Sequence, residues 1–249
     1  MIAGVVTTVP GRFLDLAFHA RCPGCGREGA PICAACVPAL DARLELPAGI
    51  PIGLPSDVPA PQLQLEWCAP FDGVVRRALH ELKYSGETRL AVPLGEAVAR
   101  RWHRAGAGGD LLVPVPVHAE RRRHRGYDQA ELIAAAASRR LGMPMSPILE
   151  RARATTAQFD LDRRTRAANV AGAFRLRRAG GRPGGDQRGA ERPGDQRGAE
   201  RRDAHPLRGR WIVLVDDVVT TGATLAACAA PLLEAGALGV SAITVARER

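Results

Sequence analysis

Acidic and hydroxyl side chains gather in one short stretch near the carboxyl end of the chain. Asp216 and Asp217 precede residues 220–224, which read TTGAT. Threonine hydroxyls, a glycine that permits close backbone approach and the N–H groups at a helix N-terminus together bind an anion, most simply a phosphate. Carboxylates beside that anion suit ribose hydroxyls, or a Mg²⁺ ion carried in by a polyphosphate. The alternative is that the two aspartates only cap a helix, but two acids and three threonines exceed what capping requires.

The secondary structure predicted around this stretch places it at the end of a strand. Residues 212–215 read IVLV, and a run that is apolar at every position is typical of a strand covered on both faces. Alanine and leucine then recur at helical spacing up to Gly236, and residues 240–246 form a further apolar strand. The right-handed crossover rule predicts that the two strands are parallel. We therefore expect the site at the carboxyl edge of a parallel α/β sheet, where ligands bind in this class of fold.

A second strand is predicted to end in a strongly basic loop. Residues 111–117 read LLVPVPV, and the loop at residues 118–129 follows directly. If this strand joins the same sheet, its loop lies at the same edge as the acidic pair, and guanidinium groups would bind a pyrophosphate through bidentate hydrogen bonds. The alternative is an exposed basic loop that binds nothing. The arginines of this loop are Arg121, Arg122, Arg123 and Arg125.

Three helices are predicted around these strands. Apolar residues recur at helical spacing in residues 71–84, 89–103 and 130–141. The first of these helices has a basic face, which we interpret as exposed to solvent. That face contains Arg76, Arg77, His80 and Lys83.

Four cysteines near the amino end have the spacing of metal ligands. They form the pairs CPGC and CAAC, and each C-x2-C pair wraps a tight turn, so the four thiolates can surround one tetrahedral Zn²⁺ ion. Four protein ligands close the coordination sphere, which makes such a zinc structural rather than catalytic. The rival interpretation is a loose set of free thiols, since disulfides are not expected in a reducing cytoplasm. The predicted ligands are Cys22, Cys25, Cys33 and Cys36.

The composition of the chain indicates the charge of its partners and the division of the chain into regions. The 249 residues carry a formal net charge of +9, which favours partners that bear phosphate. No stretch approaches the roughly 18 apolar residues of a membrane span, and no signal peptide is recognised, so we expect a cytoplasmic protein with no membrane span. Residues 1–46 hold the cysteine cluster, 47–66 read as a proline-rich linker and 67–249 as the main domain. A tandem repeat without apolar anchors predicts a disordered insertion at residues 178–208.

Several of these motifs resemble a known family. Residues 212–224 resemble the 5-phosphoribosyl-1-pyrophosphate (PRPP) motif of the type I phosphoribosyltransferases. A wider set of segments is similar to the ComF-type phosphoribosyltransferase-like family. The set consists of this motif, the cysteine cluster and the two stretches FDGVVRRALHELKYSG and VPVPVHAERRRHRGYDQAELIA. That family covers proteins linked to natural transformation and relatives named for gluconate utilisation. Gln158, Arg163 and Asn169 also resemble positions of its motif, whereas Asp128 stands where asparagine is usual.

The resemblance implies a fold and a set of site residues. The fold would be a type I phosphoribosyltransferase-like parallel sheet flanked by helices, with a small N-terminal zinc-binding module. PRPP would bind together with Mg²⁺. The implied catalytic residues are Asp216, Asp217 and Arg125. The implied PRPP-binding residues are Asp216, Asp217, Val218, Thr220, Thr221, Gly222, Ala223, Thr224, Arg121 and Arg123.

Two functions are compatible with this edge of the sheet. One is an enzyme, or a former enzyme, that binds PRPP or a related phosphoribosyl ligand and transfers or cleaves the phosphoribosyl group. The other, which the resemblance implies for transformation proteins, is a factor in the uptake of single-stranded DNA that works with a partner in the DNA-uptake machinery. Aromatic residues make up only 4% of the chain, which argues against base stacking as the main mode of DNA binding. No acceptor for the phosphoribosyl group can be named.

Overall fold

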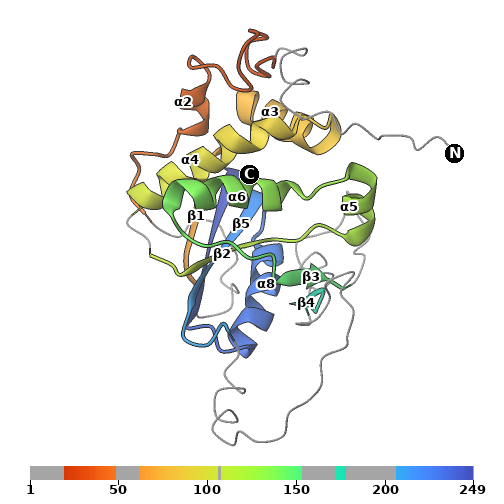
Figure 1. Cartoon of the computed structure of the whole chain (residues 1–249). Coiled ribbons are helices and arrows are strands. Elements are labelled where there is room, and N and C mark those ends of the chain that lie inside the picture. Colours follow the sequence, from red (N-terminus) through yellow and green to blue (C-terminus); the bar gives the residue numbers. More distant parts are fainter. Residues whose placement is uncertain (1–19, 49–61, 106–107, 153–171, 178–205, 249) are drawn as a thin grey trace, which may run out of the picture.

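The computed structural model describes residues 20–48, 62–105, 108–152, 172–177 and 206–248. Its centre is a four-stranded parallel sheet in the order β1-β6-β5-β2, which confirms the predicted fold class (Figure 1). The strands of this sheet are β1 (Gln62–Pro70), β2 (Leu111–Pro114), β5 (Trp211–Val219) and β6 (Gly239–Arg247). A separate antiparallel pair consists of β3 (Leu149–Arg151) and β4 (Phe174–Leu176).

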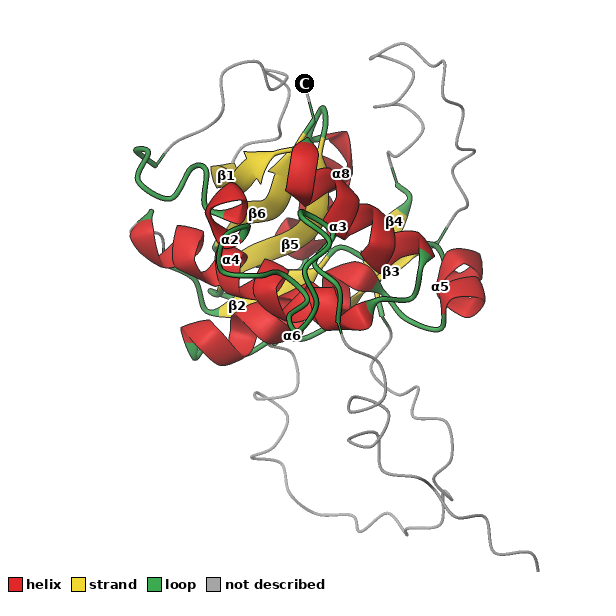
Figure 2. Cartoon of the chain, turned by 90° about the horizontal axis from the view of Figure 1, so that it is seen from above, coloured by secondary structure: helices red, strands yellow, loops and turns green. Residues whose placement is uncertain are grey.

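Helices cover both faces of the parallel sheet (Figure 2). One face packs against α3 (Gly73–Tyr84), α4 (Ala91–Arg104) and α6 (Gln129–Leu141), and the other packs against α8 (Ala223–Glu234). These bounds confirm the helices predicted from apolar spacing. The short helices are α2 (Val37–Leu40), the 3-10 helix η1 (Thr88–Leu90) and α5 (Ala119–Arg125).

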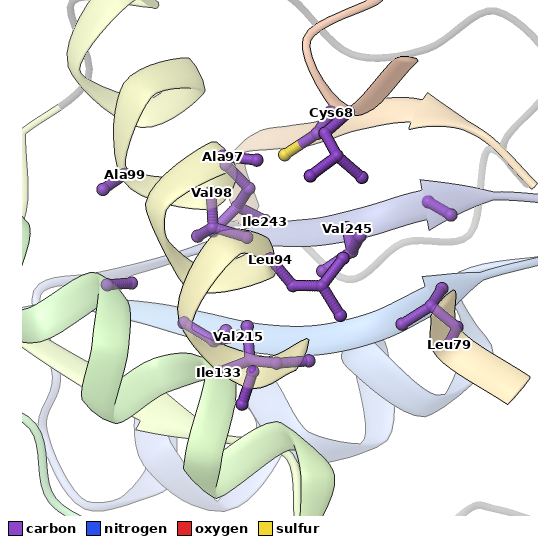
Figure 3. Close-up of a cluster of buried hydrophobic side chains, with 14 of the residues drawn as sticks. Cys68, Leu79, Leu94, Ala97, Val98, Ala99, Ile133, Val215, Ile243 and Val245 are labelled. Atoms are coloured by element: carbon purple, nitrogen blue, oxygen red, sulfur yellow. The ribbon is translucent and has the colours of Figure 1, made fainter. Parts of the chain in front are cut away.

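Side chains of β5 alternate between two hydrophobic clusters. Val213 and Val215 belong to the cluster under α3, α4 and α6, whereas Ile212 and Leu214 belong to the cluster under α8. Figure 3 shows the first cluster, in which Leu94 and Ile133 lie close to Val215. Burial on both faces explains why residues 212–215 are apolar at every position.

Several sequence-based assignments of secondary structure were wrong. The loop predicted at residues 118–129 contains the helix α5, because the His118 side chain accepts a hydrogen bond from the backbone N–H of Glu120 and Gly126 ends the helix in the left-handed conformation. β2 ends at Pro114 rather than at residue 117, in a stretch where prolines lack the N–H that a strand ladder needs. β1, which was not predicted, takes in residues 62–66 of the supposed linker.

Some predicted features lie outside the described residues. These include Gln158, Arg163 and Asn169, the linker residues 49–61 and the insertion up to residue 205. Among the helices that the structure describes, none combines the length and the apolar character needed to cross a membrane.

Candidate functional site

The acidic pair lies within β5 rather than in the loop after it. Asp216 pairs with Thr244 of β6 in the sheet register, and its Oδ1 accepts a hydrogen bond from the backbone N–H of Asp217 at 2.8 Å. Oδ1 of Asp217 in turn accepts a hydrogen bond from the N–H of Val218 at 3.0 Å. Because β2 and β5 are parallel neighbours, the basic segment after β2 and the acids near the end of β5 lie at the same edge of the sheet. The expectation that both segments meet at one edge is confirmed.

The threonine loop leads directly into α8. Gly222 is the N-cap residue of this helix and has the left-handed conformation, with φ of 80°. A glycine has no side chain to accept hydrogen bonds from the N–H groups of the first helical turn. Among the described contacts, the only loop hydroxyl that accepts such a bond is Thr221 Oγ1, at 3.4 Å from the backbone N of Ala223. The start of α8 therefore has N–H groups that an anion can use.

Asp216 lies on the α8 side of the sheet, among groups from three other elements. Its charge acts on the thiol of Cys228 in α8 and on the guanidinium of Arg151 in β3, and Arg151 is also affected by the positive charge of Arg121. Burial, followed by the neighbouring charge of Asp217, raises the pKa of Asp216 well above the usual aspartate range. Arg151, which the sequence analysis did not name, is thus affected by the charges of both Asp216 and Arg121, which it did name.

Asp217 lies on the opposite side, where it forms an ion pair with Lys83 of α3. The side chain of Asp217 is 9% exposed and that of Lys83 is 20% exposed, so this pair is largely shielded from water. α3 reaches the acid because it crosses the carboxyl edge of the sheet: Phe71, just before it, donates its N–H to the Arg247 carbonyl at the end of β6, at 2.8 Å. Lys83 was predicted to face solvent, and that interpretation was wrong. Nothing in the local pattern of a basic helix face points to a partner so distant in sequence.

The arginines of α5 do not act as one group. Arg121 and Arg125 are four residues apart and share a helix face, whereas Arg123 lies on another face. Arg121 and Arg123 are both exposed. Arg125 donates a hydrogen bond to Oε1 of Gln129 at 3.0 Å, and its guanidinium carbon lies 5.1 Å from the ring centroid of Tyr84. Of the arginines of α5, Arg121 is the one whose charge acts on Arg151.

Asp128 fixes the basic segment to α6. Its carboxylate accepts hydrogen bonds from the backbone N–H groups of Val117, Ala130 and Glu131, so it caps α6 and holds the end of the β2 segment at once. Burial raises the pKa of this carboxyl group. The departure from asparagine at this position thus keeps the capping oxygen.

The four predicted metal ligands do converge. The sulfur atoms of Cys22, Cys25, Cys33 and Cys36 all lie within 4.8 Å of one another. Zn–S bonds of about 2.3 Å place the sulfurs of a tetrahedral site about 3.8 Å apart, so the cluster fits a metal ion such as zinc. Burial acts to raise the pKa of the Cys22 thiol, but hydrogen bonds from the backbone of Cys33, Cys25 and Gly24 outweigh it and lower this pKa to about 6. Burial and hydrogen bonds with the other three thiols raise the pKa of Cys36 to about 12, so the sulfur positions, rather than the pKa values, support a metal site.

The cysteine cluster is docked on α3. The Arg77 side chain donates hydrogen bonds to the carbonyls of Pro23, at 2.6 Å, and Gly24, at 3.0 Å. Ile32 and Leu40 from the same region are buried in the cluster under α3 and α4. Arg77 is exposed, as predicted, but it also bonds to the cysteine cluster, so the same helix contacts both that cluster and the acidic pair.

The raised pKa of Asp216 gives a stability prediction. Above the usual aspartate pKa of about 3.9, the unfolded chain loses this proton while the folded protein retains it, so folding stability falls as pH rises towards the folded-state pKa. Asp216→Asn removes the titration and should raise Tm at pH 7, with the difference shrinking as the pH approaches 3.9. Scanning calorimetry at several pH values checks this prediction. Glu96→Gln, on the exposed face of α4, is the control and should leave Tm unchanged at every pH measured. A lower Tm for Asp216→Asn at pH 7 would contradict it.

Known proteins resemble this chain over about half of its length or more. A DNA utilization protein YhgH from Escherichia coli (strain K12) is 30% identical over 225 residues, which cover 88% of this chain and 80% of that protein. Competence protein F from Haemophilus influenzae is 31% identical over 117 residues, or 47% of this chain and 41% of that one. No protein-family model matches the chain.

Among solved structures, a glutamine PRPP amidotransferase from B. subtilis, complexed with ADP and GMP, is 18% identical to this chain. The similarity covers 60% of this chain and 25% of that one, with a TM-score of 0.34. Similarity of this extent carries no conclusion about ligands.

Proposed function

The chain belongs to the ComF-type phosphoribosyltransferase-like family, and on that premise we propose that it binds PRPP, or a related phosphoribosyl ligand, at the carboxyl end of β5. The observation that carries the proposal is the start of α8, where Gly222 replaces a capping side chain and leaves the first-turn N–H groups for an anion. The 5-phosphate would bind at this loop. The hydroxyl-bearing residues beside it are Thr220, Thr221 and Thr224, with Val218 and Ala223 supplying backbone.

The remaining groups of the ligand have candidate partners on both sides of β5. Asp216 and Asp217 would accept hydrogen bonds from ribose hydroxyls, and Arg121, Arg123 and Arg125 are separate candidates for binding the pyrophosphate. Carboxylate and hydroxyl oxygens are also the donors that Mg²⁺ prefers, so these residues fit an ion that accompanies PRPP. Bound Mg²⁺ would neutralise part of the pyrophosphate charge.

Transfer or cleavage of the phosphoribosyl group would need little covalent chemistry from the protein. Departure of pyrophosphate from C1 leaves positive charge on the ribose, so the chain's contribution is to hold the leaving group with arginines and the ribose with carboxylates. No nucleophilic side chain is required. Lys83, which pairs with Asp217, and Arg151, which is affected by the charge of Asp216, would supply positive charge on the two sides of β5.

The ion pair with Lys83 allows a specific prediction for the replacement of Asp217. A ribose that binds Asp217 must compete with the ion pair, and removing the carboxylate leaves the ammonium group of Lys83 near the site without its partner. Asp217→Asn should therefore weaken PRPP binding by about 10- to 150-fold, which corresponds to hydrogen bonds to a charged group worth roughly 1.5–3 kcal/mol. Inorganic phosphate should bind as well as before, or more tightly.

Calorimetric titration with PRPP and Mg²⁺, beside titration with phosphate, tests this expectation. Glu96→Gln is a matched control, since it removes one negative charge from an exposed position of α4. Equal losses for PRPP and phosphate in Asp217→Asn, or no PRPP binding by the unaltered protein, would reject the assignment.

The cysteine cluster has a separate role in this proposal. We infer that Cys22, Cys25, Cys33 and Cys36 hold one structural Zn²⁺ ion, because their four sulfurs lie within 4.8 Å of one another and four thiolates fill the coordination sphere of zinc. The contacts of Arg77 with Pro23 and Gly24 support a role in fixing α3, and with it Lys83.

A second candidate function is binding of single-stranded DNA. The relatives named DNA utilization protein and Competence protein F favour it, and so does α5, none of whose residues is buried and whose last four residues are all basic. Exposed guanidinium groups bind backbone phosphates without regard to sequence. A partner in the DNA-uptake machinery belongs to this second proposal.

A further inference from the structure

Tyr84 is an aromatic residue that the hydrophobic core does not use. It is the last residue of α3, and 67% of its surface is exposed. The chain has only two tyrosines, and the other, Tyr127, donates its hydroxyl to the carbonyl of Leu82. A large exposed ring contributes little to folding, so its position calls for another explanation.

Two side chains hold the exposed ring in place. The imidazole of His80, one helical turn earlier, lies with its centroid 4.8 Å from that of Tyr84, at an interplanar angle of 47°. The guanidinium carbon of Arg125, at the end of α5, lies 5.1 Å from the ring centroid, and Arg125 is itself held by Gln129. The hydrogen bond from Tyr127 fixes the turn after α5 to the end of α3. The ring is therefore pre-oriented, which lowers the entropic cost of stacking a ligand on it.

The ring also lies beside the proposed phosphate-binding groups. Its neighbour in sequence, Lys83, pairs with Asp217 at the end of β5, and Arg125 belongs to the same helix as Arg121 and Arg123. A flat π-surface next to a row of exposed cations is the combination that binds single strands, since bases stack on the ring while the cations bind the backbone. A double-stranded ligand keeps its bases stacked on each other and would not use the ring.

We propose that Tyr84, with Arg125 and His80, is a stacking platform for one unpaired base of single-stranded DNA whose phosphates lie along α5. This inference rests on the second candidate function and gives it a base-binding position. The low aromatic content of the chain remains compatible with it, because a single ring takes a single base. The main attraction along the strand would come from the arginines.

The test measures how tightly the full-length protein binds labelled oligothymidylate and an abasic oligonucleotide of the same length. Fluorescence anisotropy at low salt gives both affinities. Tyr84→Ala should weaken oligothymidylate by about 5- to 150-fold, the loss expected from one base–aromatic stack. It should leave the abasic strand, which has phosphates but no bases, within about twofold of the unaltered protein. Tyr84→Phe keeps the ring and should bind both strands normally.

Leu238→Ala is the matched control. This side chain is 69% exposed and lies just before β6, at the amino edge of the sheet, so its removal should change neither affinity. Equal binding of oligothymidylate by Tyr84→Ala and the unaltered protein would overturn the proposal. So would equal losses for the two strands, or no binding of oligothymidylate by the unaltered protein. PRPP titration of Tyr84→Ala separates this failure from failure of the phosphoribosyl site, since that site should be intact in the variant.

Discussion

Replacing Gly222 by valine should abolish measurable binding of both PRPP and inorganic phosphate, a loss of at least about 100-fold, or roughly 3 kcal/mol. Gly222 has φ of 80°, a conformation that a β-branched residue adopts only with strain. It is also the N-cap of α8, where a branched side chain would occupy the space through which an anion approaches the backbone N–H groups. Isothermal titration calorimetry with each ligand measures the effect.

Two other variants separate the causes of this loss. Thr224→Val removes one hydroxyl worth roughly 0.5–1.5 kcal/mol and should weaken both ligands by only about 2- to 12-fold. Gly209→Val imposes similar backbone strain, since Gly209 has φ of 73°, but it lies before β5 at the amino edge of the sheet. Gly209→Val should lower Tm and keep its ligand affinity. Phosphate binding by Gly222→Val at the unaltered affinity would show that the anion binds elsewhere.

Removal of the metal should lower the stability of the whole protein. Cys22 and Cys33 are 1% and 6% exposed, and Leu40 from the same region is fully buried against α3 and α4. Zinc binding by four thiolates supplies about 10–16 kcal/mol in small zinc-binding peptides, so Cys33→Ser should release the ion and lower Tm by about 10 °C or more. Elemental analysis and scanning calorimetry of the purified variant measure the two effects together.

The control for Cys33→Ser is the replacement of a cysteine outside the cluster. Cys68 is buried in β1 and is not among the four converging thiols, so Cys68→Ala should lower Tm by a core-packing effect while it keeps one zinc per chain. The unaltered protein should also contain one zinc after washing with a chelator. Stoichiometric metal in Cys33→Ser, or an unchanged Tm after complete metal removal, would contradict the structural role.

Features that depend on residues close together in the sequence could be predicted from the sequence. The strand, loop and helix from Trp211 to Glu234 follow from an unbroken apolar run, a glycine at the turn and alanines at helical spacing. The cysteine cluster follows in the same way, because each C-x2-C pair is a local turn and four thiols need one common centre. These patterns encode local backbone geometry, which the chain adopts largely without regard to distant segments.

The sheet order and the electrostatics of the site were decided by tertiary structure alone. β1 escaped prediction because its burial depends on partners elsewhere: Glu66 is fully buried, and it is paired with Arg101 of α4 at 2.6 Å. Lys83 looks like a member of a solvated helix face, since helical periodicity records which side of a helix is polar but not what lies against that side. Asp216 and Asp217 look like one pair, yet alternation along β5 and the packing of α3 and α8 give them opposite surroundings. Contacts between segments far apart in the chain depend on how whole elements pack, and no local pattern of residue types contains that information.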